Sequence, residues 1–314
     1  MRSKISLQIV SVVLFVSAIS INVFSQKRTA AAAKSAPTAR SITVVTEPKA
    51  AVWIDEIRRG TTDEKGQLKI DRLSAGNRKL RVRAVGFAEK TQPLAAAQRG
   101  EIKVALTKTT DEADIAFQQA EELRESGKEE NKRKAIELYK KALDLRPKFA
   151  DARVGWARTI ETADPDAALE QISEARKARP AFAEASTVEG RIYRESSDLE
   201  NAVKSFKRAI REANNFQPEA HTGLALAYKD QGNHTAAIAE FKIAIAQFAD
   251  SEPILYQLLG ETYEQAGRKK EAVAAYEKFL QLAPTSNLAS AVRSIIEQLK
   301  SKQNQGDTVE LMPQ

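Results

Sequence analysis

Cysteine is absent from the sequence, and histidine occurs only twice. Without cysteine there can be no disulfide framework, no thiolate metal site, no thiol nucleophile and no lipid-attachment cysteine. His221 and His234 lie thirteen positions apart, without the i, i+4 pairing of a histidine metal site on a helix. The chain also lacks a glycine-rich phosphate loop, a G-x-S-x-G elbow and an H-E-x-x-H helix. We therefore expect no catalytic residues, no cofactor and no metal, and a protein that is not an enzyme.

The net charge of +7 is divided unevenly along the 314 residues. Residues 42–110 hold 14 basic and 8 acidic side chains, whereas residues 111–314 hold 29 basic and 34 acidic ones. Neither part has the dense basic patch interleaved with aromatic residues that binds nucleic acid. We therefore expect no nucleic-acid partner, and a weak attraction between a basic first half and an acidic second half.

The start of the chain has the pattern of an export signal. Arg2 and Lys4 precede an uncharged stretch, and Val23 and Ser25 fit a signal-peptidase cleavage site. We expect residues 1–25 to be a signal peptide cleaved near Ser25, and the protein to be periplasmic or secreted. The alternative is an anchor in the inner membrane formed by residues 5–26, because 22 uncharged residues can span a bilayer. Membrane contact is expected only in that second case.

Two further stretches are expected to have no packed structure, and the first of them lacks large apolar side chains. Residues 26–41 predict a flexible linker, and residues 301–314 predict a polar, disordered tail.

Residues 42–109 carry short alternating and β-branched runs separated by turn residues. From Lys79 to Ala84 the basic and apolar side chains alternate, which predicts one solvent-exposed and one buried strand face. The pattern predicts a small antiparallel β-sandwich of five or six strands.

This β-domain resembles the PEGA domain, which is named for a Pro-Glu-Gly-Ala turn between its first strands. Residues 48–51 (Pro-Lys-Ala-Ala) take the place of that turn, and Gly60-Thr61-Thr62 and Gly86-Phe87 match later markers. Lys49 and Glu56 depart from the family pattern. The resemblance implies a non-catalytic surface module of bacterial envelope proteins. Four arginines are candidate contacts to an envelope glycan, or alternatively form a solvated strand face: Arg58, Arg59, Arg81 and Arg83.

The second half repeats itself every 33 to 35 residues. An alanine opens each second helix of a repeat, a large apolar residue follows four positions later, and another packing residue follows three further on. These spacings place all three on one helix face. The alanines are Ala135, Ala168, Ala202, Ala237 and Ala272, and the large residues are Tyr139, Ile172, Phe206, Phe241 and Tyr276. Close approach of the first helices is expected at Trp156, Gly190, Ala225 and Gly260.

These residues resemble the tetratricopeptide repeat (TPR), and the match is close from Tyr256 to Pro284. The resemblance implies an all-α solenoid, wound as a right-handed superhelix, with about five repeats over residues 111–284. Residues 285–300 supply the apolar side chains of a capping helix. The predicted fold is therefore multidomain, with a PEGA-like β-sandwich before a TPR solenoid.

The family resemblance also implies a concave groove, lined by the first helices, that binds a peptide or protein segment. An arginine there could hold a partner carboxylate through a bidentate pair. The candidate groove residues are Arg153, Thr187, Arg191, Arg194, Thr222, Lys229, Gln257, Glu261 and Glu264.

Two functions follow from these patterns. The first is an adaptor of the bacterial envelope that binds a protein or peptide of unknown identity in the TPR groove. The second is an envelope-binding module, in which the basic β-domain docks to a glycan or an anionic surface and the repeats act as a spacer or oligomerisation element. Steep weakening of binding by salt would favour the second.

Overall fold

The computed structural model describes residues 40–73, 76–249 and 251–309. The predicted signal peptide, the alternative anchor at residues 5–26 and most of the predicted linker lie outside these residues. No helix in the described part of the chain is long and apolar enough to cross a membrane.

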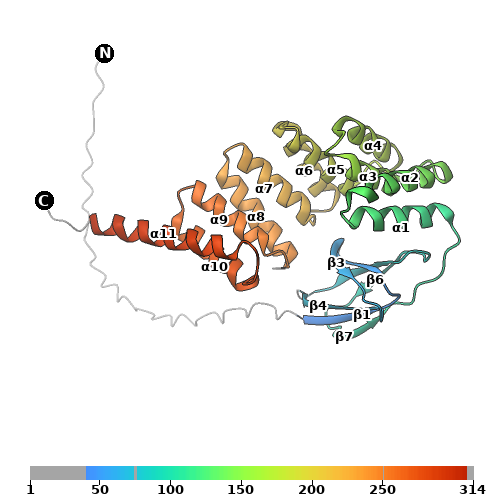
Figure 1. Ribbon diagram of the computed structural model, residues 1–314, viewed down its shortest axis with the longest axis horizontal. Helices are drawn as coiled ribbons and strands as arrows, with labels where there is room; N and C mark the ends of the chain where they lie inside the picture. The colour runs from blue at the N-terminus through green and yellow to red at the C-terminus, as the bar shows by residue number, and fades with distance from the viewer. Residues whose placement is uncertain (1–39, 74–75, 250, 310–314) are drawn as a thin grey trace, which may run out of the picture. The chain divides into compact units, whose positions relative to one another are not determined.

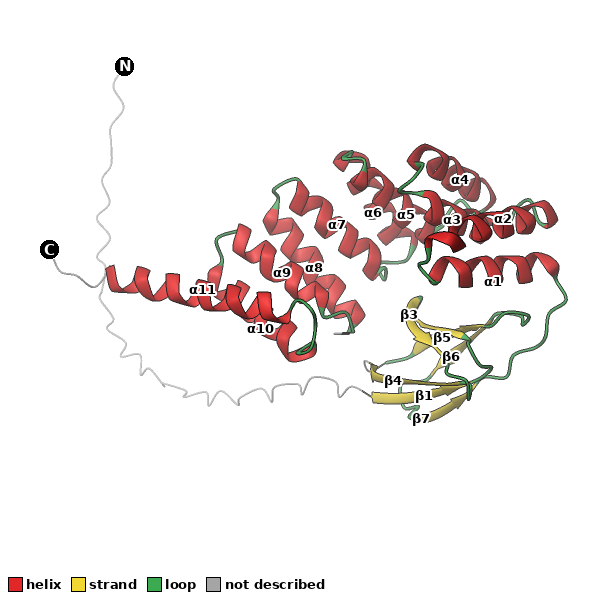
Figure 2. Ribbon diagram, viewed as in Figure 1, coloured by secondary structure: helices red, strands yellow, loops and turns green. Residues whose placement is uncertain are grey.

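In the described residues, seven strands precede eleven helices (Figures 1 and 2). One sheet has the strand order β4-β1-β7 and the other β3-β2-β5-β6. The strands are β1 (Arg40–Val45), β2 (Ala51–Ile54), β3 (Ile57–Thr61), β4 (Gln67–Leu73), β5 (Arg78–Arg83), β6 (Lys90–Leu94) and β7 (Gly100–Lys103).

The β-region differs from the sequence prediction in strand number and direction. β1 pairs with β4 antiparallel but with β7 parallel, with Val44 opposite Ile102, so the region is not purely antiparallel. Seven strands are present instead of five or six. The additional strands are β3 and β6, which form the two edges of the second sheet. The two sheets share one apolar core, which includes Val44, Val52 and Leu80.

The expected linker ends earlier than predicted, because Arg40 begins β1. Its side chain is 2% exposed, and its guanidinium donates to the carbonyl oxygens of Gly76 at 3.0 Å and Gln98 at 3.3 Å. Arg40 is therefore a structural residue of the β-region.

Two tight turns use left-handed backbone at residues other than glycine. Lys49 has φ 58°, and Asp55 and Glu56, between β2 and β3, have φ 50° and 65°. Left-handed backbone at two consecutive residues is typical of a type I′ hairpin turn. This turn directs Ile57, the next residue, away from the β-core.

The helices follow one another in chain order (Figure 1), and each odd-numbered helix from α1 to α9 makes its main contacts with the next helix. They are α1 (Glu112–Glu125), α2 (Glu129–Leu145), α3 (Ala150–Ile160), α4 (Pro165–Ala178), α5 (Ala183–Glu195), α6 (Leu199–Glu212), α7 (Pro218–Asp230), α8 (His234–Phe248), α9 (Ile254–Gln265), α10 (Lys269–Leu282) and α11 (Ala289–Val309).

The predicted packing stripe is buried in every pair. All five repeat alanines are 0% exposed, as are the aromatic rings of Tyr139, Phe241 and Tyr276. Glycines on the first helices let these rings approach: a Cβ on Gly260 would lie 2.6 Å from Cε1 of Tyr276.

Helix α3, which packs on α2 of the first pair, departs from the sequence prediction, which placed the close approach at Trp156. A Cβ on Gly155 would lie 2.6 Å from Cε1 of Tyr139, so Gly155 is the contact residue. Trp156 is only half-buried against the same cluster.

The last helix, α11, packs on α10 through Val292, Ile296 and Leu299, which covers the end of the apolar core. It continues to Val309, beyond the expected end of the capping helix at residue 300 and into the predicted tail.

Candidate functional site

All nine candidate groove residues lie on first helices of the repeats. Arg153 is on α3; Thr187, Arg191 and Arg194 are on α5; Thr222 and Lys229 are on α7; Gln257, Glu261 and Glu264 are on α9. The structure distributes them over separate surroundings and does not gather them into one site.

Three of the four basic candidates are paired with carboxylates of neighbouring repeats. Arg191 donates to Glu161 through Nε at 3.0 Å and Nη2 at 2.9 Å. Arg194 donates to Asp230 at 2.7 Å, and Lys229 to Glu261 at 2.7 Å. These three cations are already paired within the chain, so a partner carboxylate would have to compete with Glu161, Asp230 or Glu261 for them.

The remaining candidates have local partners as well. Thr187 is 2% exposed and donates to the carbonyl of Ala183 at 2.8 Å, one helical turn earlier. Thr222 makes the same kind of bond to Pro218 at 2.9 Å. Arg153 donates to Gln171 at 3.0 Å. These contacts support the helices and the packing between them, rather than presenting polar groups to a ligand.

The second sheet and the first helices line a cavity of ≈ 1610 Å³ that is open to solvent. Its lining comes from β2, β3, β5 and β6 on one side and from α1, α3, α5 and α7 on the other. Arg191 is the one groove candidate among its described lining residues, and Arg58, Arg81 and Arg83 of the predicted glycan-contact set line it as well. The β-region therefore covers part of the face where a partner segment was expected.

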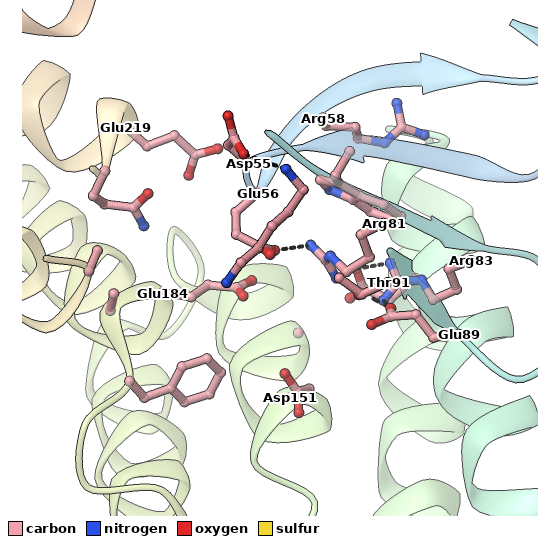
Figure 3. A pocket seen from close by; sticks show the side chains of 18 of the residues that line it. Asp55, Glu56, Arg58, Arg81, Arg83, Glu89, Thr91, Asp151, Glu184 and Glu219 are labelled. Atoms are coloured by element: carbon pink, nitrogen blue, oxygen red, sulfur yellow. Dashed lines mark hydrogen bonds and ion pairs between the residues drawn. The ribbon is translucent and has the colours of Figure 1, made fainter. Parts of the chain in front are cut away.

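Stacked cations form the strand side of this cavity. The guanidinium of Arg81 lies 4.2 Å from the centroid of the Trp53 ring, and that of Arg83 lies 4.8 Å from it. Arg81 also pairs with Glu56 at 2.8 Å and with Glu89 at 3.3 Å (Figure 3). The strand face that the alternation predicted to be solvent-exposed is thus largely occupied by contacts.

Arg83 joins the β-region to α1. Its side chain lies over the ring of Phe117, 5.0 Å from the centroid, and donates to Glu121 at 3.3 Å. Arg83 is 9% exposed and Glu121 is 7% exposed. The prediction of a solvated or glycan-facing Arg83 is wrong, because α1 covers it.

Glu121 is the centre of a buried charge cluster. It accepts hydrogen bonds from Arg124 at 2.9 Å, from Arg83 and from the hydroxyl of Tyr139. Burial alone would raise the pKa of Glu121, but Arg124 above all, with Arg83, outweighs burial and lowers the pKa to about 2. The carboxylate therefore stays ionised and holds α1, α2 and β5 together. Burial, with the charge of Glu121, also raises the pKa of Tyr139.

Two further contacts fix the same junction. The side chain of Gln118 accepts from the backbone N–H of Gly86 at 3.0 Å and donates to the carbonyl of Phe87 at 2.8 Å. Arg58 donates to Glu125 at 2.6 Å. The charge imbalance predicted a weak attraction between the two halves of the chain. The structure shows specific ion pairs between them, Arg83 with Glu121 and Arg58 with Glu125.

A second pocket of ≈ 440 Å³ lies on α9 and is lined by Glu261, Glu264 and Gln265. Two of the sequence candidates therefore share one opening, and its charged groups are acidic. The hydroxyl of Tyr276, on α10, donates to Glu264 at 3.2 Å. Burial raises the pKa of this tyrosine, and Glu264 raises it further, so the tyrosine remains a neutral donor.

No group of three or more histidine, aspartate or glutamate side chains in the described residues could hold a metal ion. The cavity chemistry is ion pairing and cation–π stacking, with no nucleophile set beside a base. The arrangement can hold polypeptide or neutralise charge.

Sequence comparison with protein families matches residues 160–218 and 222–287 to one tetratricopeptide repeat model and residues 127–149 to another. The helices in these ranges are tetratricopeptide repeats. The matched ranges begin after α1 and do not include the strands.

Solved structures agree with this TPR fold. A structure titled as the functional characterisation of Pseudomonas aeruginosa PilF has a TM-score of 0.54 and 16% identity, covering 63% of this chain and 88% of its own. The crystal structure of PilW, titled a widely conserved type IV pilus biogenesis factor, has a TM-score of 0.52 and 18% identity, covering 62% and 93%. A thermophilic TPR protein of Thermus thermophilus has a TM-score of 0.48 and 25% identity, covering 60% and 98%.

The likenesses to PilF and PilW show the fold of the helical part alone and do not identify a ligand. A search of curated protein sequences finds no match.

Sequence reasoning missed the junction between the β-region and the TPR array. The available signal was the opposite charge of the two halves, with Trp53, Arg81 and Arg83 on adjacent strands. Pairing them with Glu121 required the three-dimensional arrangement.

Proposed function

We propose that this protein is a non-enzymatic scaffold of the bacterial cell envelope, whose TPR groove binds a segment of another protein. The observation that carries the proposal is the opening on α9, where Glu261, Glu264 and Gln265 line a pocket on a first helix of the array. First helices of stacked repeats form the extended concave surface that such proteins use for binding.

The envelope location is part of the proposal and rests on the export pattern of residues 1–25 and on the resemblance of the β-region to a PEGA domain. N-terminal sequencing of the protein purified from its own cells tests export. A mature chain that begins at Gln26 supports it, whereas one that retains Met1 favours the anchor formed by residues 5–26.

Site-specific photocrosslinking in those cells tests the groove. A benzophenone side chain replaces Gln265, which is exposed beside the pocket, or Ala246, which is exposed on the second helix α8 and serves as the control. We expect a protein adduct from position 265 and none from position 246. Adducts from position 246 alone would contradict binding in the groove.

The second candidate is an envelope-binding module that docks through the basic β-region to a glycan or an anionic surface. The net positive charge of residues 42–110 favours it. Against it, Arg58, Arg81 and Arg83 are engaged by carboxylates of the same chain. Binding to isolated envelope that falls steeply between low and moderate salt would support this candidate.

A further inference from the structure

The β2–β3 turn reaches the apolar cluster of the TPR array. Ile57 is 6% exposed, yet it does not belong to the core of the β-region. It belongs instead to the cluster of α7 to α11, which includes Ala225, Leu255 and Leu259. A side chain of the β-region thus occupies an apolar site formed by these residues of the repeats, called the seat below.

The two residues after Ile57 are basic; Arg58 forms an ion pair with the array, and Arg59 interacts electrostatically with one of its carboxylates. Arg58 donates to Glu125 on α1 at 2.6 Å. Burial lowers the pKa of Arg59, and the charge of Glu252, just before α9, opposes this shift. Correspondingly, burial raises the pKa of Glu252, and Arg59 opposes that shift. The array therefore offers one apolar seat with a carboxylate for each arginine.

The contact with Arg59 is incomplete. Its Nε is buried and donates no hydrogen bond within the described residues. Buried donors are rarely left unpaired in proteins. A segment of another protein that replaced the hairpin with all its buried donors hydrogen-bonded would therefore bind more favourably than the hairpin does. The hairpin also holds Asp55 and Glu56 in left-handed backbone, a conformation that asparagine, aspartate and glycine adopt most readily and glutamate less so.

The charges elsewhere on the first helices favour a basic ligand. The concave cations Arg158, Arg191 and Arg194 are paired with carboxylates of the array, which leaves little positive charge for an acidic segment. The open pocket on α9 is lined by Glu264, which accepts from the neutral hydroxyl of Tyr276, and by Glu261, which Lys229 pairs. Residues 111–314 as a whole carry more acidic than basic side chains.

We propose that the groove recognises a segment in which an aliphatic residue precedes two basic residues, and that Ile57-Arg58-Arg59 of the β2–β3 hairpin occupies this seat until such a segment displaces it. The proposal rests on the groove function proposed above and names its partner class. The hairpin is an occupant in cis, so the observed affinity for a partner is lowered by the fraction of chains in which the seat is filled.

Peptide binding to the full chain tests the recognition. The probe is a fluorescein-labelled peptide of residues 51–61, AVWIDEIRRGT, compared with the same peptide carrying Arg58→Glu and Arg59→Glu. The proteins are wild type, Ile57→Asp, which empties the seat, and Ile243→Asp, the same substitution at a residue that is 40% exposed on α8.

We expect Ile57→Asp to bind the basic peptide at least tenfold more tightly than wild type or Ile243→Asp, and the charge-reversed peptide to bind none of them. Equal affinity for Ile57→Asp and wild type would overturn the proposal. So would binding that ignores the charge reversal, or failure of the peptide to bind any of the three proteins.

A distance measurement tests occupancy without the peptide. Because the sequence has no cysteine, Lys65→Cys and Gln281→Cys place spin labels on the exposed β3–β4 turn and on α10 without background labelling. We expect a narrow distance distribution in wild type and a broad one in Ile57→Asp. The ion pair between Arg58 and Glu125 supplies a milder variant. Arg58→Glu should broaden the distance distribution, and adding Glu125→Arg should make it narrow again. Identical distributions in all variants would overturn the cis occupancy.

The two proposals fail differently. An adduct at position 265 that forms equally in wild type and Ile57→Asp would refute displacement of the hairpin and leave the scaffold function intact. Absence of any adduct from both would refute the scaffold function.

Discussion

Glu121 should make the stability of this protein strongly dependent on acid pH. Its pKa is lowered from 4.5 to about 2 in the folded chain by Arg124 and Arg83, against the effect of burial. A carboxylate with a depressed pKa stabilises the fold above its unfolded pKa and loses that contribution as the pH falls through its folded pKa. The window for Glu121 therefore lies between about pH 4.5 and pH 2.

The magnitude follows from the shift. At about 1.4 kcal/mol per pKa unit, Glu121 contributes about 3 kcal/mol to the free energy of unfolding at pH 7, and about 1 kcal/mol remains at pH 3. Glu121→Gln keeps the shape of the side chain but leaves two arginines without their counter-ion. Breaking a buried pair in this way costs about 3–5 kcal/mol.

The assay is urea unfolding of wild type and Glu121→Gln at several pH values from 7 to 2.5. We expect the gap between their unfolding free energies to narrow by about 2–3 kcal/mol over this range. Glu277→Gln is the control, because its partner Lys300 is 55% exposed and an exposed pair contributes little. If the gap for Glu121→Gln is constant with pH, the carboxylate is not held ionised by these arginines and the reasoning is refuted.

Three further substitutions test the packing and pairing of the array. Gly260→Ala should destabilise by about 1–2 kcal/mol in thermal unfolding although alanine favours helix, because its Cβ would lie 2.6 Å from Tyr276; a gain in stability would contradict that contact. Ala249→Gly should stabilise by up to about 1 kcal/mol, since Ala249 ends α8 with φ 53°, and a loss measured by urea unfolding would refute the left-handed cap. Arg191→Glu should destabilise by about 1–3 kcal/mol by opposing Glu161, and the added change Glu161→Arg should recover most of the loss; no recovery would show that the pair is not the cause.

The repeats were predictable because their information is local and periodic. An alanine followed by a large residue four positions later defines a helix face within one turn, and this pattern recurs in five helices. The prediction was wrong in detail at Trp156, where the neighbouring Gly155 makes the contact, because intervals of 34 and 35 residues both occur between repeats and the spacing alone allowed either position.

The β-region was predictable only in part. β3, with the sequence IRRGT, has adjacent arginines and a glycine, and β6 contains Pro93, so neither shows the alternation that identifies a strand. Proline is tolerated in β6 because this strand lies at a sheet edge. The parallel pairing of β1 with β7 joins segments more than fifty residues apart, which no local pattern encodes.

The candidate site was predictable in its placement but not in its chemistry. The register of the repeats correctly assigned all nine candidates to first helices. Their partners lie about thirty residues away, as Glu161 does from Arg191 and Glu261 from Lys229, so the sequence alone left these cations free. Whether a charge is available to a ligand depends on its neighbours in space, and residue type alone does not decide it.

The pairing of these cations changes which partner the array can select. A segment with a carboxylate would have to displace Glu161 or Asp230 from its arginine, and would gain little because one ion pair replaces another. A basic segment meets the same cost at Glu261, which Lys229 already pairs, but not at Glu264, which accepts from the neutral hydroxyl of Tyr276. It also has Ile57-Arg58-Arg59 as a template within the chain itself. Selection by the array should therefore favour a segment in which an aliphatic residue accompanies the basic ones, as Ile57 accompanies Arg58 and Arg59.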